Sequence, residues 1–132
     1  MDALLSQSAS SLLVCSIYED QRPLKGAAGH LDWRLKGFLS RFVMGGRITG
    51  SPGEFVYVPV KRHDSIRHLL LVGLGHQGAQ AQPPEADLIA KLAKRVAQLQ
   101  FKRVVVSRSS FPGLDENKIA KALKGVEVEF TE

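Results

Sequence analysis

The stretch LLLVGLGHQG, residues 69–78, joins a run of apolar residues to three closely spaced glycines. The apolar run is typical of a buried strand, and Gly73, Gly75 and Gly78 complete the pattern G-x-G-x-x-G. After a strand, that pattern is typical of the turn that holds the pyrophosphate of a dinucleotide. The stretch is therefore either a nucleotide site or a strand that leaves its sheet through a glycine turn.

The residues that follow disfavour a dinucleotide turn. Such a turn needs a helix that begins at the glycines, so that the first amides of the helix point at the pyrophosphate. Here Pro83 and Pro84 separate Gly78 from the next expected helix. An acidic residue is also expected about 20 positions further on to hold the ribose, and Gln98 stands there. We therefore interpret Gly73 and Gly75 as the residues that let a buried strand leave the sheet edge through tight backbone angles.

On both sides of this stretch, the spacing of apolar residues predicts alternating strands and helices. Apolar or alternating runs predict strands at 11–18, 54–60, 67–72, 103–106 and 126–130. Apolar residues at three- and four-residue steps predict helices at 31–44 and 85–100, and a shorter helix that is capped by Asp115 and ends at Lys124. The segment 19–29, which carries Gly26 and Gly29, is expected to be a loop. The order β-α-β-β-α-β-α-β predicts an α/β domain with three layers, in which helices flank a mixed sheet.

Two of these strands are expected to form a hairpin. Lys61–Ser65 is a short link, so the strands at 54–60 and 67–72 should be adjacent and antiparallel. Pro59 has no backbone N–H group, so its strand is expected to end there or to lie at a sheet edge.

The composition is that of one globular domain. The chain has 132 residues, of which 44% are hydrophobic and 23% are charged. No apolar run reaches the roughly 20 residues of a membrane helix, and no basic segment precedes the apolar stretch near the N-terminus, which argues against a secretory signal. The single cysteine, Cys15, falls in an apolar run, so we expect a buried thiol and a reducing compartment, most simply the cytoplasm.

The sequence contains no assembled catalytic or metal-binding constellation. The histidines at 30, 63, 68 and 76 form no H-x-x-x-H or H-E-x-x-H pair, and no second cysteine is present to complete a zinc set. The serines after the strand at 103–106 lie outside any G-x-S-x-G turn. We therefore predict no catalytic residue, no metal and no cofactor, and we expect a binding or assembly domain.

The formal net charge of +5 permits an acidic partner. The basic residues are spread along the chain, with modest clusters at 61–63, 91–95 and 102–103. A solvated basic face is one interpretation. The alternative is nucleic-acid binding through Lys91, Lys94 and Arg95 on the helix expected at 85–100.

Several stretches, taken in order, resemble the N-terminal domain of the leucyl aminopeptidase (cytosol aminopeptidase) family. They are EDQRPLKGAAGHLDWRLKGFLSRFVMGGRITGSPGE at 19–54, FVYVP at 55–59 and RHLLLVGLG at 67–75. Within them, ITGSPGE is similar to an F-x-G-x-x-G-E turn of the family, and the strand that runs into VGLG follows in the family's order. The resemblance covers nearly the whole chain and implies one macro-domain-like domain over residues 1–132.

In that family the domain precedes a catalytic domain that carries two metal ions and an N-T-D-A-E-G-R stretch, and this chain contains no such stretch. The resemblance therefore implies a stand-alone relative without peptidase activity, or a fragment or subunit of a metal-dependent leucyl aminopeptidase. The family's N-terminal domains are implicated in packing subunits into hexamers and, in some bacterial members, in DNA binding. The implied partners are a second copy of the chain or an aminopeptidase-type catalytic partner, and no membrane.

The macro-domain likeness implies a further alternative. Macro domains bind ADP-ribose in loops that follow sheet strands, and two glycine segments of this chain fall at roughly analogous places. Loop amides can hold a phosphate without the help of side chains. By this analogy of fold, the candidate ligand-binding residues are Gly26, Gly29, Gly73, Gly75 and Gly78.

Overall fold

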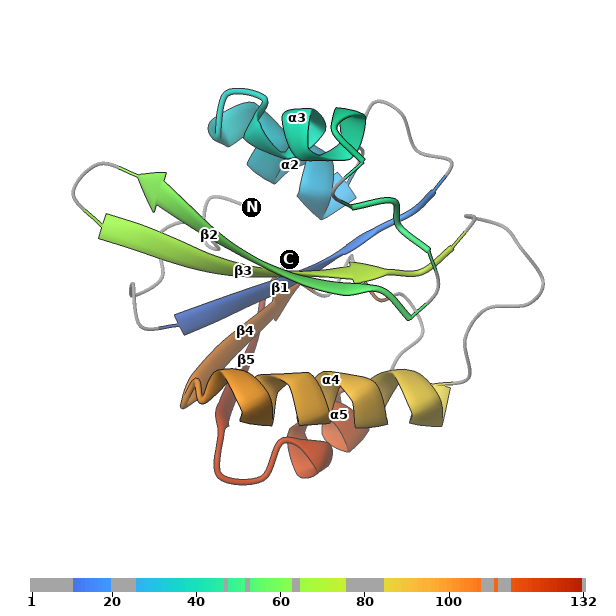
Figure 1. Cartoon of the computed structure of the whole chain (residues 1–132). Coiled ribbons are helices and arrows are strands. Elements are labelled where there is room, and N and C mark those ends of the chain that lie inside the picture. Colours follow the sequence, from blue (N-terminus) through green and yellow to red (C-terminus); the bar gives the residue numbers. More distant parts are fainter. Residues whose placement is uncertain are drawn as a thin grey trace.

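The computed structural model describes residues 11–19, 26–46, 48–51, 53–62, 65–75, 85–107, 111 and 115–131. Its elements follow the order β-α-α-β-β-α-β-α-β (Figure 1). The strands are β1 (Ser11–Ile17), β2 (Phe55–Arg62), β3 (Ser65–Gly73), β4 (Arg103–Ser107) and β5 (Glu127–Thr131). The helices are α2 (Gly26–Arg34), α3 (Phe38–Met44), α4 (Glu85–Leu99) and α5 (Glu116–Ala122). Among the described residues, no helix is both long and apolar enough to cross a membrane.

The strands form one mixed sheet in the order β2-β3-β1-β4-β5. β1 runs parallel to its neighbours β3 and β4, and β5 runs parallel to β4. β2 and β3 form the predicted antiparallel hairpin, although both strands run further into the expected turn, to Arg62 and from Ser65. The mixed sheet and its hairpin are confirmed.

Pro59 lies on β2, which is an edge strand, but β2 does not end there. The Gly73 amide donates to the Glu54 carbonyl at 2.7 Å, and Pro59 pairs with His68. Because hydrogen-bonded pairs alternate along an antiparallel ladder, the backbone nitrogen of Pro59 faces away from β3. An edge position of this kind needs no N–H group, which explains why proline is accepted in mid-strand.

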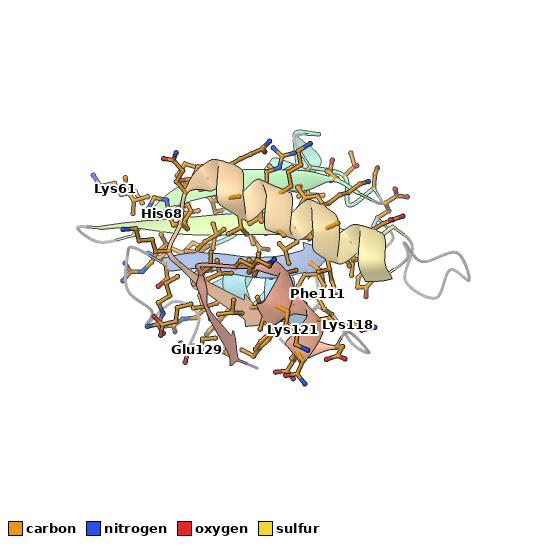
Figure 2. The ribbon with its side chains drawn as sticks, turned by 90° about the horizontal axis from the view of Figure 1, so that it is seen from below. Lys61, His68, Phe111, Lys118, Lys121 and Glu129 are labelled. Carbon is orange, nitrogen blue, oxygen red and sulfur yellow. The ribbon has the colours of Figure 1, made fainter. Side chains whose placement is uncertain are left out.

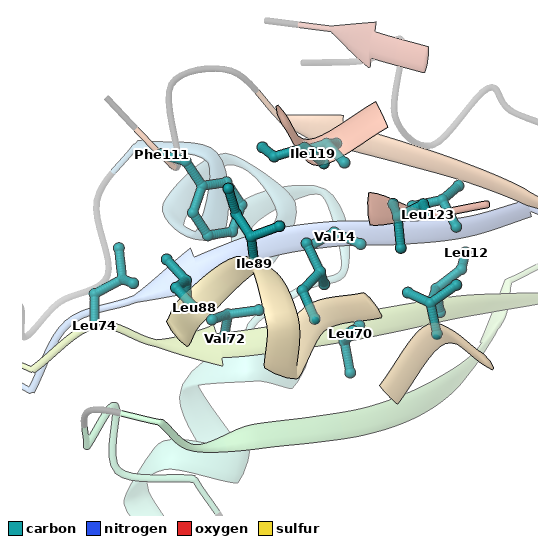
Figure 3. Close-up of a cluster of buried hydrophobic side chains, with 14 residues drawn as sticks. Leu12, Val14, Leu70, Val72, Leu74, Leu88, Ile89, Phe111, Ile119 and Leu123 are labelled. Carbon is teal, nitrogen blue, oxygen red and sulfur yellow. The ribbon is translucent and has the colours of Figure 1, made fainter. Parts of the chain in front are cut away.

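Helices cover both faces of the sheet, so the predicted three layers are confirmed (Figure 1). Every residue of β1 is buried, and its side chains alternate between two apolar cores. Leu13 and Ile17 pack in the core beneath α2 and α3, with Leu39 of α3. Leu12 and Val14 pack in the opposite core beneath α4 and α5. That core also contains Leu70, Val72, Leu74, Leu88, Ile89, Phe111, Ile119 and Leu123 (Figure 3).

The predicted single helix over 31–44 is wrong. The chain forms two helices, and the residues between them include Lys36 and Gly37, whose φ angles are 56° and 80°. Glycine adopts this left-handed conformation without the penalty of a Cβ atom, so Gly37 marks the break. Leu35 and Phe38 nevertheless pack on the same core, and the apolar spacing therefore continues across the break.

The first of these helices begins earlier than predicted, at Gly26. Gly26 and Gly29 consequently lie in α2, and the expected loop at these two glycines is wrong. The short helix near the C-terminus was predicted more accurately. The carboxylate of Asp115 accepts a hydrogen bond from the Asn117 amide at 2.9 Å, which confirms the predicted cap, although α5 ends at Ala122 and not at Lys124.

Candidate functional site

The glycine turn after β3 packs directly against the ITGSPGE segment. A Cβ atom built on Gly73 would lie 2.1 Å from the Ser51 carbonyl oxygen, and one built on Gly50 would lie 2.8 Å from the Glu19 nitrogen. Both glycines are therefore required because two backbones approach closely. Gly75 has a φ of 82°, which confirms the tight backbone angle predicted there. Gly73 lies outside the left-handed region, so lack of space, and not its backbone angle, excludes a side chain.

Backbone groups of this turn are engaged in hydrogen bonds to neighbouring segments. The Gly73 amide donates to the Glu54 carbonyl, the Leu74 amide to the Ile17 carbonyl at 3.1 Å, and the Gly75 amide to the Gly50 carbonyl at 2.8 Å. A phosphate could use these three amides only by displacing the carbonyl groups that accept from them. The ligand-binding role assigned to Gly73 and Gly75 stays a prediction.

The other predicted ligand glycines have different surroundings. Gly26 and Gly29 lie at the start of α2, where the first amide groups of a helix have no acceptor within the helix. The part of the predicted site formed by Gly26 and Gly29 therefore lies at a helix N-terminus and not in a loop. Its phosphate binding stays a prediction. Gly78 lies outside the described residues. α4 begins only at Glu85, as expected from the two prolines that precede it.

Within the ITGSPGE segment, the carboxylate of Glu54 accepts hydrogen bonds from residues that precede it. Glu54 Oε1 accepts hydrogen bonds from the Gly50 amide at 2.7 Å and from the Thr49 amide at 3.0 Å. Glu54 Oε2 accepts from the Thr49 hydroxyl at 3.2 Å. The Thr49 hydroxyl in turn contacts the Ser51 hydroxyl at 2.7 Å. Consecutive backbone amides that converge on one anion are typical of a backbone nest. Sequence reasoning missed this contact, although the turn motif ending in Glu54 was its signal.

The predicted nucleic-acid residues lie on α4. Lys91, Lys94 and Arg95 are all exposed there, and Lys91 also reaches towards the ITGSPGE segment. Its Nζ atom lies 3.1 Å from the position that a Cβ atom on Gly53 would take.

The helix packed beside α4 adds further basic side chains that the sequence reasoning missed. They are Lys118 and Lys121 of α5, which are labelled in Figure 2, and the exposed Lys124 just after this helix. Their spacing of three residues was the available signal. We call the exposed basic side chains of α4 and α5 the basic layer. Acidic side chains are exposed at the starts of the same helices, at Asp87, Asp115 and Glu116.

His68 belongs to an aromatic cluster at the β2–β3 hairpin. Its Nδ1 atom lies 2.5 Å from the Tyr57 hydroxyl, and the two rings stack with an interplanar angle of 10°. The Phe101 ring lies 4.9 Å from the His68 ring, centroid to centroid. Within the described ranges, no three His, Cys, Asp or Glu residues gather closely enough to hold a metal ion. His63 and His76 fall outside those ranges.

Cys15 is buried in the core beneath α2 and α3, as predicted. Removal from water raises the pKa of its thiol from 9.0 to about 12. A thiol with so high a pKa stays protonated at physiological pH and is a poor nucleophile.

Sequence comparison matches residues 14–128 to the N-terminal domain of the cytosol aminopeptidase family. The chain belongs to the cytosol aminopeptidase family. A probable cytosol aminopeptidase from Burkholderia multivorans is 36% identical over 97 residues, which cover 70% of this chain and 19% of the relative. A second probable cytosol aminopeptidase, from Paraburkholderia phymatum, is 35% identical over 109 residues, which cover 76% of this chain and 22% of that relative. The chain therefore spans about a fifth of the length of these aminopeptidases.

Solved structures confirm the fold expected of this aminopeptidase domain. A tomato leucine aminopeptidase variant superposes with a TM-score of 0.62 and 20% identity, over 96% of this chain and 30% of the other. The macrodomain of Mycobacterium tuberculosis DarG superposes with a TM-score of 0.67 and 16% identity, over 96% and 91%. At these identities the likeness shows the fold alone, a macro-domain-like α/β domain.

Proposed function

We propose that this aminopeptidase N-terminal domain is a non-catalytic module for assembly or protein interaction in the cytoplasm. The observation that carries the proposal is the exposure of two large apolar side chains on the helices that cover one face of the sheet. Trp33 of α2 is 72% exposed and Met44 of α3 is 86% exposed. Exposed apolar side chains that gather on one surface are a feature of protein–protein interfaces.

The chemistry around Trp33 supports the same role. The Arg34 guanidinium carbon lies 5.9 Å from the centroid of the Trp33 ring, within the range of a cation–π contact. Tryptophan and arginine are enriched among the residues that contribute most to binding energy at interfaces. The helices α2 and α3 pack together as one layer on this face of the sheet (Figure 1). Our proposal is that one partner surface covers both side chains. The partner we propose first is a second copy of the chain.

Trp33 is the only tryptophan and reports directly on this surface. We expect light scattering to show a rise in mass between about 1 µM and about 1 mM protein, with a blue shift of tryptophan emission. Met44→Ser should remove both changes. Ile66→Ser, which alters an exposed apolar residue on β3, is the control and should retain them. A chain that stays monomeric throughout, and that also fails to bind the catalytic region of the Burkholderia multivorans aminopeptidase, would overturn the proposal.

A second candidate is nucleic-acid binding, and the basic layer of α4 and α5 favours it. Lys91, Lys94 and Arg95 are exposed on α4, and Lys118 and Lys121 are exposed on the neighbouring helix α5 (Figure 2). Contacts between these cations and phosphates release counterions, so the affinity should fall steeply as salt rises. Fluorescence anisotropy with labelled duplex DNA at several salt concentrations measures this slope. Binding that does not depend on salt would exclude the mechanism.

A third candidate is a phosphate ligand of the ADP-ribose type, favoured by the superposition on macrodomains over more than nine-tenths of both chains. Calorimetry with ADP-ribose tests it, and the absence of heat at millimolar ligand would end it. The remaining alternative is a fragment or subunit of a metal-dependent leucyl aminopeptidase. Hydrolysis of a leucine chromogenic substrate by the purified chain, with manganese or zinc added, would contradict the non-catalytic role.

A further inference from the structure

Gly50, whose amide donates to the Glu54 carboxylate, is held in place by contacts that do not involve this carboxylate. The Gly50 carbonyl accepts from the Gly75 amide at 2.8 Å, and the Gly50 backbone lies against the backbone of Tyr18 and Glu19. With a φ of 89°, Gly50 adopts a conformation that favours glycine. The ends of β1 and β3 therefore hold this loop in place. The amides of Thr49 and Gly50 should keep their direction when the carboxylate leaves.

A positive charge lies beside the same loop. The Nζ atom of Lys91 on α4 lies close to Gly53. In the sequence, Gly53 immediately precedes Glu54. The hydrogen bonds from Thr49 to Glu54 are exposed and the one from Gly50 is part-buried, so an ion from solvent can reach the Thr49 donors directly. Two amides, one hydroxyl and a nearby ammonium group are the donors that oxyanions prefer in proteins.

We propose that Thr49 and Gly50 form a binding site for a small oxyanion, which is a phosphate or a carboxylate group, that the Lys91 ammonium group beside the same loop favours the charge of this anion, and that Glu54 occupies the site in the free protein. An external oxyanion binds when the Glu54 side chain swings out. The site uses none of the amides of Gly73–Gly78 and does not rest on the assembly role of Trp33.

The test compares wild-type protein with Glu54→Gln, which keeps the side-chain size but removes the charge. Inorganic phosphate and acetate are titrated separately while the backbone amides are followed by ¹⁵N NMR, so the two ligand classes are distinguished. We expect the variant to bind at least one of them tenfold or more tightly than wild type, with the largest saturable shifts at Thr49 and Gly50. Adding Lys91→Gln to the variant should weaken the binding several-fold.

Glu116→Gln is the matched control, because it removes one exposed carboxylate from α5 and changes the net charge equally. It should bind no more tightly than wild type at Thr49 and Gly50. Glu54→Asp, whose carboxylate is one methylene shorter, provides a second folded variant and should also bind more tightly than wild type. The proposal is overturned if the Thr49 and Gly50 amides of the folded variants do not respond to either anion up to about 100 mM. Association of the chain through Trp33 would remain testable in either case.

Discussion

The Ser51 carbonyl oxygen lies so close to Gly73 that a Cβ atom on this glycine would sit 2.1 Å away. A side chain fits there only if the strand or the loop moves. We expect Gly73→Ala to lower the free energy of unfolding by about 2–3 kcal/mol, because an added methyl group in a packed site forces the surroundings apart. Urea denaturation of both proteins measures the difference.

Gly46→Ala is the control for this effect. Gly46 has a φ of 74°, and a Cβ atom there would meet nothing within 4 Å. Its substitution should cost only the backbone strain, about 1 kcal/mol. Equal losses in the two variants would contradict the steric explanation at Gly73.

Asp32 supplies the cap that α3 does not have in its own sequence. Gly37 precedes α3 and makes no side-chain cap, but Asp32 of α2 accepts from the Ser40 amide at 2.9 Å and also from the Ser40 hydroxyl. We expect Asp32→Ala to lower the free energy of unfolding by about 1–2 kcal/mol, since the first turn of α3 loses its acceptor. Ser40→Ala keeps the hydrogen bond from the backbone amide of residue 40 to Asp32 and should lower the free energy of unfolding by less. A larger loss from Ser40→Ala, measured by urea denaturation, would refute the capping role.

Asp115 is itself the N-cap residue of α5, and its side chain accepts from the Asn117 amide. Asp115→Ala should destabilise the protein by about 1 kcal/mol, because the helix start is left with an unsatisfied donor. Asp115→Asn retains an acceptor oxygen and should recover most of the loss. Thermal unfolding followed by circular dichroism compares the three proteins, and a similar loss in both variants would count against the cap.

The high pKa of the Cys15 thiol predicts a pH dependence of stability. The folded state keeps this proton up to a pKa of about 12, whereas the unfolded state loses it near 9.0. Between these values the unfolded state binds fewer protons, so this group lowers the free energy of unfolding as the pH rises from 9.0 towards about 12. At pH 8 a thiol reagent should label the folded protein far more slowly than the protein in urea. Equal labelling rates would show that the thiol is accessible.

The strands and α4 could be predicted because burial imposes simple spacings on them. β1 lies between two cores and is apolar throughout, and the inward stripe of α4 at Leu88, Leu92 and Val96 keeps the helical period. The break at Gly37 could not be predicted in this way, because Leu35 and Phe38 pack on one core from both sides of it. Apolar spacing records which side is buried and not whether the backbone is continuous.

The candidate site was less predictable because its contacts join distant parts of the chain. The contact of Gly73 with Ser51 depends on the loop lying over the end of β3, and no local pattern encodes it. The hydrogen bonds of Glu54 are local, and the turn motif singled out the right residues without showing that the amides already bind a carboxylate. The sequence likewise did not show that the amides of Gly73 and Gly75 already donate to carbonyl groups of the neighbouring loop.

The central position of β1 has a consequence for the order of folding. β1 is the first of the described strands in sequence, yet Leu12 pairs with His68 on one side and with Val104 on the other. Each pairing closes a long loop, and the entropy of closure is lost before the contacts stabilise the chain. During synthesis on the ribosome, β1 therefore emerges well before either partner strand, while the β2–β3 hairpin can form locally. The apolar side chains of β1 must be shielded until β4 has been made. The nascent chain of this small domain is therefore a candidate for chaperone binding.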